Sequence, residues 1–160
     1  MLPPRLPPST YAEQMGTRNV LVDRLMSLMS SLHRAVLHAT GWRIGRSLGS
    51  MPIVELHTRG RSTGKRRSVV LAAPVHGDGR YLLVASKGGD DRHPAWYLNL
   101  VANPEIELTV DGTTLRMRAR TAGVAEKAEL WPKIVAAYRG YDEYQHKTKR
   151  DIPVVICEPR

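Results

Sequence analysis

The sequence contains no phenylalanine and only one cysteine, Cys157. A single cysteine excludes a disulfide within the chain and a cysteine-rich metal site. It is also typical of a protein from a reducing compartment, which predicts a cytoplasmic location. Because phenylalanine is missing, the hydrophobic core must be built from Leu, Val, Ile, Met, Tyr and Trp.

Long hydrophobic runs are absent as well. No stretch approaches the roughly 20 apolar residues that a membrane-spanning helix needs. The longest candidate, residues 20–37, is interrupted first by Asp23 and Arg24 and then by His33 and Arg34. The Pro-rich residues 1–9 also lack the continuous apolar core of a signal peptide. We therefore expect neither a membrane span nor a secretion signal.

Acidic residues are scarce relative to basic ones, which gives the 160-residue chain a net charge of +9. A basic balance predicts an acidic partner, which could be nucleic acid, an anionic membrane surface or a polyanionic small molecule. A nucleic-acid-binding module is disfavoured, because the arginines do not follow one predicted helix and no zinc or RNP-like spacing is present. Metal binding is not expected either, because His33 and His38 are five residues apart with no carboxylate at ligand spacing.

The chain has the length of one domain, which we place at residues 19–160 after a flexible Pro-rich segment, residues 1–18. The domain begins with a predicted amphipathic helix, residues 20–37. Its apolar stripe recurs at three- and four-residue steps and consists of Leu21, Leu25, Leu28, Leu32 and Val36. Three surfaces could receive this stripe: the rest of the domain, a second copy in a homodimer, or an anionic membrane, with peripheral contact at the inner face of the cell membrane.

Strands dominate the remainder of the chain. The patterns predict strands at residues 53–58, 68–75, 80–86, 105–110, 113–121 and 152–157, and helices at residues 95–102 and 124–138. The turn signals His76-Gly-Asp-Gly79 and Asp111-Gly112 join neighbouring strands as hairpins. This order favours an α+β or mainly β fold, with an antiparallel sheet or small barrel and flanking helices.

The loop between the first two strands, residues 59–67, is basic and contains Gly60 and Gly64. Successive backbone amides in such a turn form an anion-binding nest, and the hydroxyls of Ser62 and Thr63 add donors. The spacing differs from that of a P-loop and from that of a dinucleotide-binding fingerprint. By itself the loop is either an anion cradle or a solvated basic turn.

A second informative stretch, residues 85–99, leaves a strand, passes a glycine pair and enters a helix at Pro94. Polar groups at a strand end and free amides at a helix start can reach a ligand. Trp96 and Tyr97 could line an aromatic ring and Asn99 could bind a carbonyl, although core packing of Trp96 is the alternative.

A third stretch places three tyrosines at three-residue spacing: Tyr138, Tyr141 and Tyr144. If the segment is helical, their rings face one way and form an aromatic wall for a flat substrate. Packing of one or two of these rings is the alternative.

In this order, the segments resemble the deazaflavin-dependent nitroreductase family of actinobacteria, the F420H2-dependent quinone and nitro reductases. The resemblance covers about residue 40 to the C-terminus, and several motifs in the same order make it specific. The matching pieces are Thr58-Arg-Gly-Arg-Ser-Thr-Gly-Lys-Arg-Arg67, Ala85-Ser-Lys-Gly-Gly89, His93-Pro-Ala-Trp-Tyr-Leu-Asn-Leu-Val-Ala-Asn-Pro104, Trp131-Pro132, Tyr138 to Tyr144 and Ile152-Pro-Val-Val-Ile-Cys-Glu-Pro159.

The resemblance implies a split β-barrel that binds coenzyme F420, an 8-hydroxy-5-deazaflavin with a phosphate and an oligoglutamate tail. It also implies transfer of a hydride from the reduced ring to a quinone, a nitroaromatic compound or another activated unsaturated acceptor. FMN or haem in the same groove is the alternative within redox proteins.

The resemblance further implies roles for individual positions. The phosphate and tail would be held by Arg61, Ser62, Thr63, Gly64, Arg67 and Ser68. The ring would be flanked by Val69, Val70, Leu71, Val84, Ala85, Ser86 and Lys87. Amides and an edge contact would come from Ala95, Trp96, Tyr97 and Asn99. Tyr141 would touch the cofactor, Tyr138 and Tyr144 would face the acceptor, and Ser86 would orient the acceptor or assist its protonation.

Overall fold

The computed structural model describes residues 8–160, and their side chains from residue 19. From residue 8 onward, the structure has a long helix followed by eight strands, with three further α-helices among them. The elements are α1 (Pro8–Ala39), β1 (Ser47–Leu48), β2 (Met51–Arg59), β3 (Arg66–Ala72), β4 (Val75–Gly77), β5 (Arg80–Val84), the 3-10 turn η1 (Lys87–Gly89), α2 (Ala95–Ala102), β6 (Glu105–Val110), β7 (Thr113–Thr121), α3 (Val124–Ala137), α4 (Gly140–Lys147) and β8 (Val154–Pro159).

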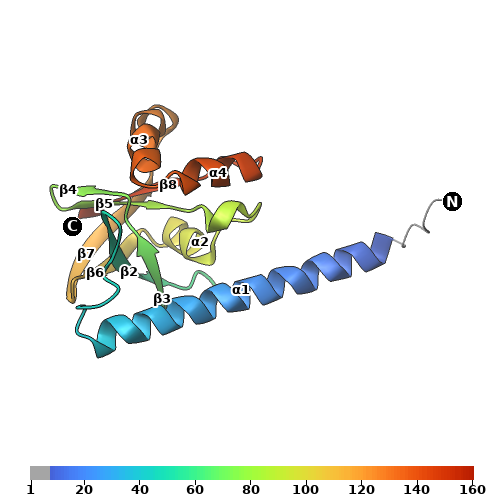
Figure 1. The fold of residues 1–160 in the computed structure, drawn as a ribbon, viewed down its shortest axis with the longest axis horizontal. Helices are drawn as coiled ribbons and strands as arrows, with labels where there is room; N and C mark the ends of the chain where they lie inside the picture. Colours follow the sequence, from blue (N-terminus) through green and yellow to red (C-terminus); the bar gives the residue numbers. More distant parts are fainter. Residues whose placement is uncertain (1–7) are drawn as a thin grey trace.

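The strands form one antiparallel sheet in the order β1-β2-β6-β7-β8-β5-β4, and β3 pairs with β2. The sheet curls, with β3 at one end beside β2 and β4 at the other end beside β5, and the helices surround it (Figure 1). This arrangement confirms the predicted split β-barrel with flanking helices. The turn between β4 and β5 has positive φ at Asp78 and Gly79, as a two-residue hairpin requires.

One predicted strand is wrong, because the structure divides it in two. Residues 68–75 were expected to form a single strand, but β3 ends at Ala72 and β4 starts at Val75. Pro74 lies between them, and it can neither donate a ladder hydrogen bond nor leave its fixed φ. The break lets the chain pass from one open side of the sheet to the other.

Two hydrophobic clusters hold the sheet because β5 and β8 are buried on both faces. Leu83 and Val155 point into the barrel interior, together with Leu56 and Leu108. Their strand neighbours point outward and pack under α3 and α4; these are Leu82, Val154 and Ile156, with Ile134 and Ile152. Alternation of side chains along each strand therefore builds both clusters from the same segments.

Helix α1 begins at Pro8 rather than at the predicted Val20, because proline is well tolerated where the first-turn N–H has no helical acceptor. Residues 1–7 of the predicted flexible segment lie outside the described residues. The helix ends at Ala39, close to the predicted stop at Gly41, whose φ of +56° suits glycine.

The contact face of α1 is largely polar. Ser30 Oγ accepts a hydrogen bond from the N–H of Val70 on the open edge of β3 at 3.0 Å. His38 Nε2 lies 2.7 Å from the buried carboxylate of Glu55, and Leu37 is completely buried.

The apolar stripe of α1 faces away from the barrel. Its members Leu21, Leu25, Leu28, Leu32 and Val36 are all exposed, and Leu28 and Leu32 keep 66% of their surface accessible. Of the three surfaces considered for the stripe, the domain itself is therefore not the one that receives it. Among residues 8–160, no helix is both long and apolar enough to span a bilayer.

Candidate functional site

The basic loop between β2 and β3 is a tight turn. Gly64 N–H donates to Gly60 O at 2.7 Å, and Gly60 N–H donates to Lys65 O at 2.8 Å. A Cβ on Gly60 would stand 2.7 Å from Thr63 Oγ1, so a larger residue there would require the Thr63 side chain to shift. Arg61, Ser62, Thr63, Gly64 and Arg67 are all exposed, as an anion-binding role requires.

Asn99 ties this loop to α2. Its side-chain Oδ1 accepts a hydrogen bond from the backbone N–H of Arg61 at 3.1 Å, and its Nδ2 donates to Thr58 Oγ1 at 3.4 Å. Asn99 is 6% exposed. The residue predicted to bind a cofactor carbonyl thus positions the loop in this structure.

The predicted ring-binding residues on β3 are divided between two faces. Val69 and Leu71 pack against the barrel cluster, whereas Val70 packs on the opposite side beneath α1. Ser68 shares the outer face, where its Oγ lies 2.7 Å from His57 Nδ1. Of the predicted ring contacts on this strand, Val69 and Leu71 point toward the barrel interior and Val70 does not.

The loop after β5 carries Ala85, Ser86 and Lys87 to the rim of the barrel. Val84, Ala85 and Ser86 are buried. Lys87 Nζ lies 2.9 Å from Asp23 Oδ1 of α1, and the hydrogen bond from Lys87 is the largest cause that lowers the pKa of Asp23. Arg92 joins the same carboxylate at 3.0 Å. Helix α1 thus reaches the predicted site through charge pairing.

Arg150, which the sequence patterns do not single out, holds this loop together. Its guanidinium donates to Ser86 O at 2.8 Å, to Ala85 O at 3.0 Å and to Asp90 O at 2.8 Å. It also lies 3.2 Å from His93 Nδ1. Burial and the charge of Arg150 lower the pKa of His93, so the imidazole is neutral and can accept this hydrogen bond. No motif surrounds Arg150, so only the fold reveals its position.

The three tyrosines form the cluster that their spacing predicts. The Tyr138 and Tyr141 rings are 5.4 Å apart at 90°, and Tyr144 lies 6.3 Å from each. Burial raises the pKa of Tyr141 to about 12, so its hydroxyl remains protonated. The backbone of α4 that carries Tyr144 adjoins Gly89, because a Cβ on Gly89 would stand 2.9 Å from Tyr144 O.

Helix α2 places its predicted ligands at the same end of the barrel. Ala95 is exposed at its first turn, while Trp96 and Tyr97 are half-buried against the barrel cluster. Tyr97 also lies beside His93, with ring centroids 5.1 Å apart. The core alternative therefore holds in part for Trp96.

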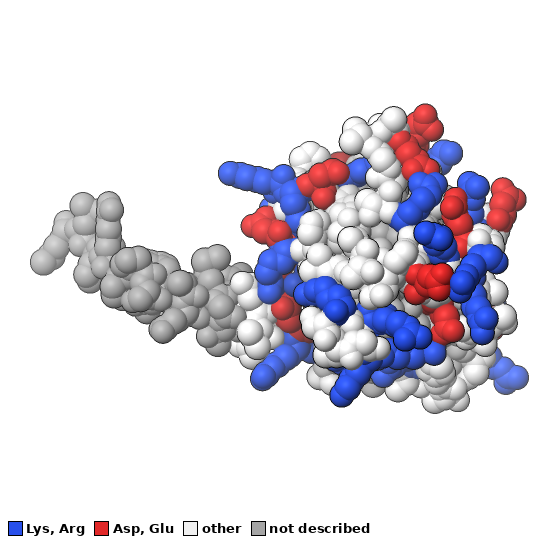
Figure 2. Space-filling model, turned by 180° about the vertical axis from the view of Figure 1, so that it is seen from behind, with Lys and Arg blue, Asp and Glu red and all other residues white. Residues whose placement is uncertain are grey.

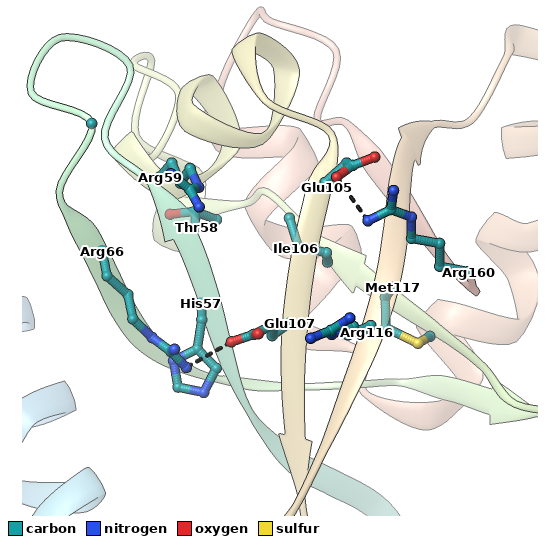
Figure 3. Close-up of a pocket in the computed structure, with 11 residues that line it drawn as sticks. His57, Thr58, Arg59, Arg66, Glu105, Ile106, Glu107, Arg116, Met117 and Arg160 are labelled. Atoms are coloured by element: carbon teal, nitrogen blue, oxygen red, sulfur yellow. Dashed lines mark hydrogen bonds and ion pairs between the residues drawn. The ribbon is translucent and has the colours of Figure 1, made fainter.

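A hollow of about 430 Å³ lies on the outer face of β2, β6 and β7, on the far side of β2 from the barrel interior (Figure 3). Of the predicted cofactor residues it contains only Gly64. Its lining consists of His57, Thr58, Arg59, Gly64, Arg66, Glu105, Ile106, Glu107, Arg116, Met117 and Arg160. The sequence patterns missed it, since its charges come from β2, β3, β6, β7 and the residue that follows β8.

Comparison with known proteins identifies the family. The family model described as F420H(2)-dependent quinone reductase matches residues 29–159. The chain belongs to this family. An F420H(2)-dependent quinone reductase of Mycobacterium tuberculosis strain H37Rv is 40% identical over 134 residues, covering 81% of this chain and 89% of the relative.

Two solved structures agree with this family membership. One, an F420-H2 dependent reductase (FDR-A), has a TM-score of 0.61 and 44% identity, covering 67% of this chain and 94% of its own. The other, described as a domain-swapped dimer, has a TM-score of 0.63 and 39% identity, covering 82% of this chain and 96% of its own. The protein is thus an F420-dependent reductase, coenzyme F420 is its cofactor, and the resemblance seen in the sequence is confirmed.

The residues of the site fit such a cofactor. An exposed basic turn with close glycine packing suits a phosphate and an acidic tail. A buried apolar rim beside tyrosine rings suits an aromatic ring. Basic side chains also cover much of the face of the domain shown in Figure 2, with acidic ones set among them. No group of three potential metal ligands occurs among the residues that the structure describes.

Proposed function

We propose that the protein reduces quinones at the rim formed by Ser86 and the tyrosine cluster, and that nitroaromatic and other activated unsaturated acceptors use the same rim. Bound F420H2 supplies the hydride. The observation that carries the proposal is the close approach of the α4 backbone at Tyr144 to Gly89, which follows Ser86 and Lys87 in the chain. Aromatic walls favour flat, apolar acceptors such as quinones.

The chain itself supplies binding and orientation. In this proposal the loop residues Arg61 to Ser68 hold the phosphate, while Val69, Leu71 and the β5 rim flank the ring. Arg150 keeps the carbonyls of Ala85 and Ser86 in place. Ser86 Oγ positions the acceptor, and Tyr138, which is 41% exposed, meets it from the solvent side.

The test is a titration with F420H2, followed by turnover with menadione and a nitroaromatic compound. We expect Ser86→Ala to lower kcat about 10-fold, because one positioned hydrogen bond to the acceptor is lost. The affinity for F420H2 should change less than kcat. Ser47→Ala, at an exposed position in β1, is the matched control.

Absence of F420H2 binding by the wild-type protein at low salt would overturn the proposal. An unchanged kcat in Ser86→Ala would remove Ser86 from the acceptor site while leaving the tyrosine cluster in place.

We further propose that a second copy of the chain covers the apolar stripe of α1. Exposed apolar patches of this kind mark interaction surfaces. The domain-swapped dimer among the solved relatives supports a homodimer as the partner. An anionic membrane surface is the competing partner, because Arg24 flanks the stripe.

A further inference from the structure

Two arginines face each other across the ladder at the end of the β2–β3 hairpin. Arg59 and Arg66 are directly opposed in the register of the two strands. Like charges in this position destabilise a sheet. Arg66 is compensated by Glu107, whose carboxylate lies 2.9 Å away. Among the described residues, no carboxylate lies within ion-pairing distance of Arg59.

The pair opens into the hollow on the outer face of the sheet (Figure 3). Arg116 stands opposite Glu107 in the β6–β7 register, yet it also forms no ion pair among the residues described. Arg160 is compensated by Glu105 at 3.0 Å. The lining holds four arginines and two glutamates, which leaves a net charge of +2.

The floor of the hollow adds no positive charge. His57 Nε2 lies 2.9 Å from Thr109 Oγ1, and Nδ1 lies 2.7 Å from Ser68 Oγ. Burial and the neighbouring Arg66 lower the pKa of His57, so its imidazole is neutral near neutral pH. The uncompensated charge of the hollow therefore belongs to Arg59 and Arg116.

The hollow is continuous with the anion-binding turn. Gly64 and Arg66 belong to the segment between Arg59 and Arg67 and also line the hollow. A ligand with a phosphate at the turn can therefore extend past Gly64 onto the outer face of β2 and β6. A guanidinium group binds a carboxylate through two parallel hydrogen bonds. A ligand with several carboxylates can therefore pair with several arginines.

We infer that this hollow binds an oligocarboxylate ligand through Arg59 and Arg116. Arg66 is shared between the ligand and Glu107. The carboxylates come either from the glutamate tail of F420 or from a separate acidic peptide. The tail assignment rests on the proposed position of the cofactor phosphate at the turn. Arg59 and Arg116 are then specificity residues for tail length, and they lie outside the ring-binding rim.

The test compares the affinity of the protein for tail-less F420 and for long-tailed F420 by fluorescence titration at low salt. The wild-type protein should bind the long-tailed form more tightly. In Arg116→Ala, the ratio of the affinity for long-tailed F420 to that for tail-less F420 should fall about 5-fold, as expected for loss of one exposed ion pair. Its affinity for the tail-less form should stay unchanged. Arg116→Lys, which keeps the charge, should restore most of the preference.

The controls separate this effect from charge and folding. Lys133→Ala removes one exposed positive charge on α3 and should leave the preference intact. Equal thermal stability of Arg116→Ala and wild type shows that the hollow, rather than the fold, has changed. Equal weakening of both cofactor forms by Arg116→Ala, or no weakening of either, overturns the inference.

A third arm uses free oligo-γ-glutamate. Competition with the long-tailed form alone supports the tail as the occupant. Binding that depends on Arg116 but does not compete with F420 supports a separate acidic peptide. If no form of F420 binds, the proposed function fails, whereas Arg116-dependent binding of oligo-γ-glutamate still supports the hollow as a carboxylate site. Absence of both kinds of binding overturns the inference as well.

Discussion

At the scale of single residues, Arg150 shows how one side chain can fix a functional loop. Its guanidinium makes hydrogen bonds to three backbone carbonyls between Ala85 and Asp90. Arginine suits this task because its planar fork serves several acceptors at once, which a lysine ammonium cannot match. The backbone course at Ser86 and Lys87 therefore depends on a residue about sixty positions away in the sequence.

We expect Arg150→Lys to lower kcat with a quinone about 10-fold, because hydrogen bonds to a charged donor contribute about 1.5–3 kcal/mol. Arg150→Gln should lower it further, since the charge is lost as well. The measurement is kcat and KM at saturating F420H2, alongside the thermal midpoint. Lys149→Gln, at the exposed neighbouring position, controls for charge. A lower midpoint with normal kcat in Arg150→Lys would show that the residue acts on stability alone.

Cys157 is a simpler case at the same scale. The thiol is buried in the barrel cluster, and burial raises its pKa to about 12. The thiolate needed for reactivity is therefore scarce, so the residue acts as a small apolar side chain.

At the scale of elements, the glycine pair of η1 decides where α4 can sit. Gly88 and Gly89 both have positive φ, so an alanine at either position is strained. They differ in surroundings. A Cβ on Gly89 would meet Tyr144 O and Lys147 Cβ at 2.9 Å, whereas a Cβ on Gly88 would meet nothing within 4 Å.

Gly89→Ala should therefore destabilise the protein more than Gly88→Ala, which carries only the backbone cost of about 1 kcal/mol. The clash should also push α4 outward and raise KM for the quinone, because Tyr144 moves with the helix. Urea unfolding and quinone KM, measured on both variants, check this expectation. Equal effects of the two substitutions would show that the contact with α4 does not constrain the site.

The helices and strands also show which features could be predicted from sequence patterns. Both hairpins, the helix that starts after Pro94 and the tyrosine face were predictable, because local turn chemistry and side-chain periodicity decide them. The break at Pro74 was missed, although proline is its local signal. β1 was not predicted because a two-residue strand has no periodicity of its own. The face on which α1 docks was predicted by no pattern, since it uses hydrogen bonds, ion pairs and Leu37 rather than the leucines of the apolar stripe.

At the scale of the whole molecule, α1 is the element whose apolar side chains remain uncovered in a single copy of the protein. Figure 1 shows the helix running past the edge of the domain. It docks through groups such as Ser30 and Leu37, while the apolar stripe defined above is exposed. Burying such a stripe is favourable at about 25 cal/mol per Å² of apolar surface.

We expect the wild-type protein to be dimeric by light scattering, and Leu28→Glu to shift it toward monomer, because a charge would be buried in the interface. Arg43→Glu, an exposed change outside the helix, is the control. Flotation with anionic liposomes tests the alternative partner, a membrane surface. A monomeric wild type that floats, and loses flotation on Leu28→Glu, would replace the second copy with a membrane surface.

The sequence by itself determined most of the strand and helix order, the basic turn, the tyrosine spacing and, through motifs in a fixed order, the F420-dependent family. These features are local, because turn chemistry and periodicity act over a few residues. Only the tertiary structure decided that Arg150 supports Ser86, that Asn99 holds the basic turn, and that Arg59 faces Arg66 above a hollow reaching Arg116. Such pairings join segments distant in the chain, and their register is set by the burial of whole strands rather than by the paired residues themselves.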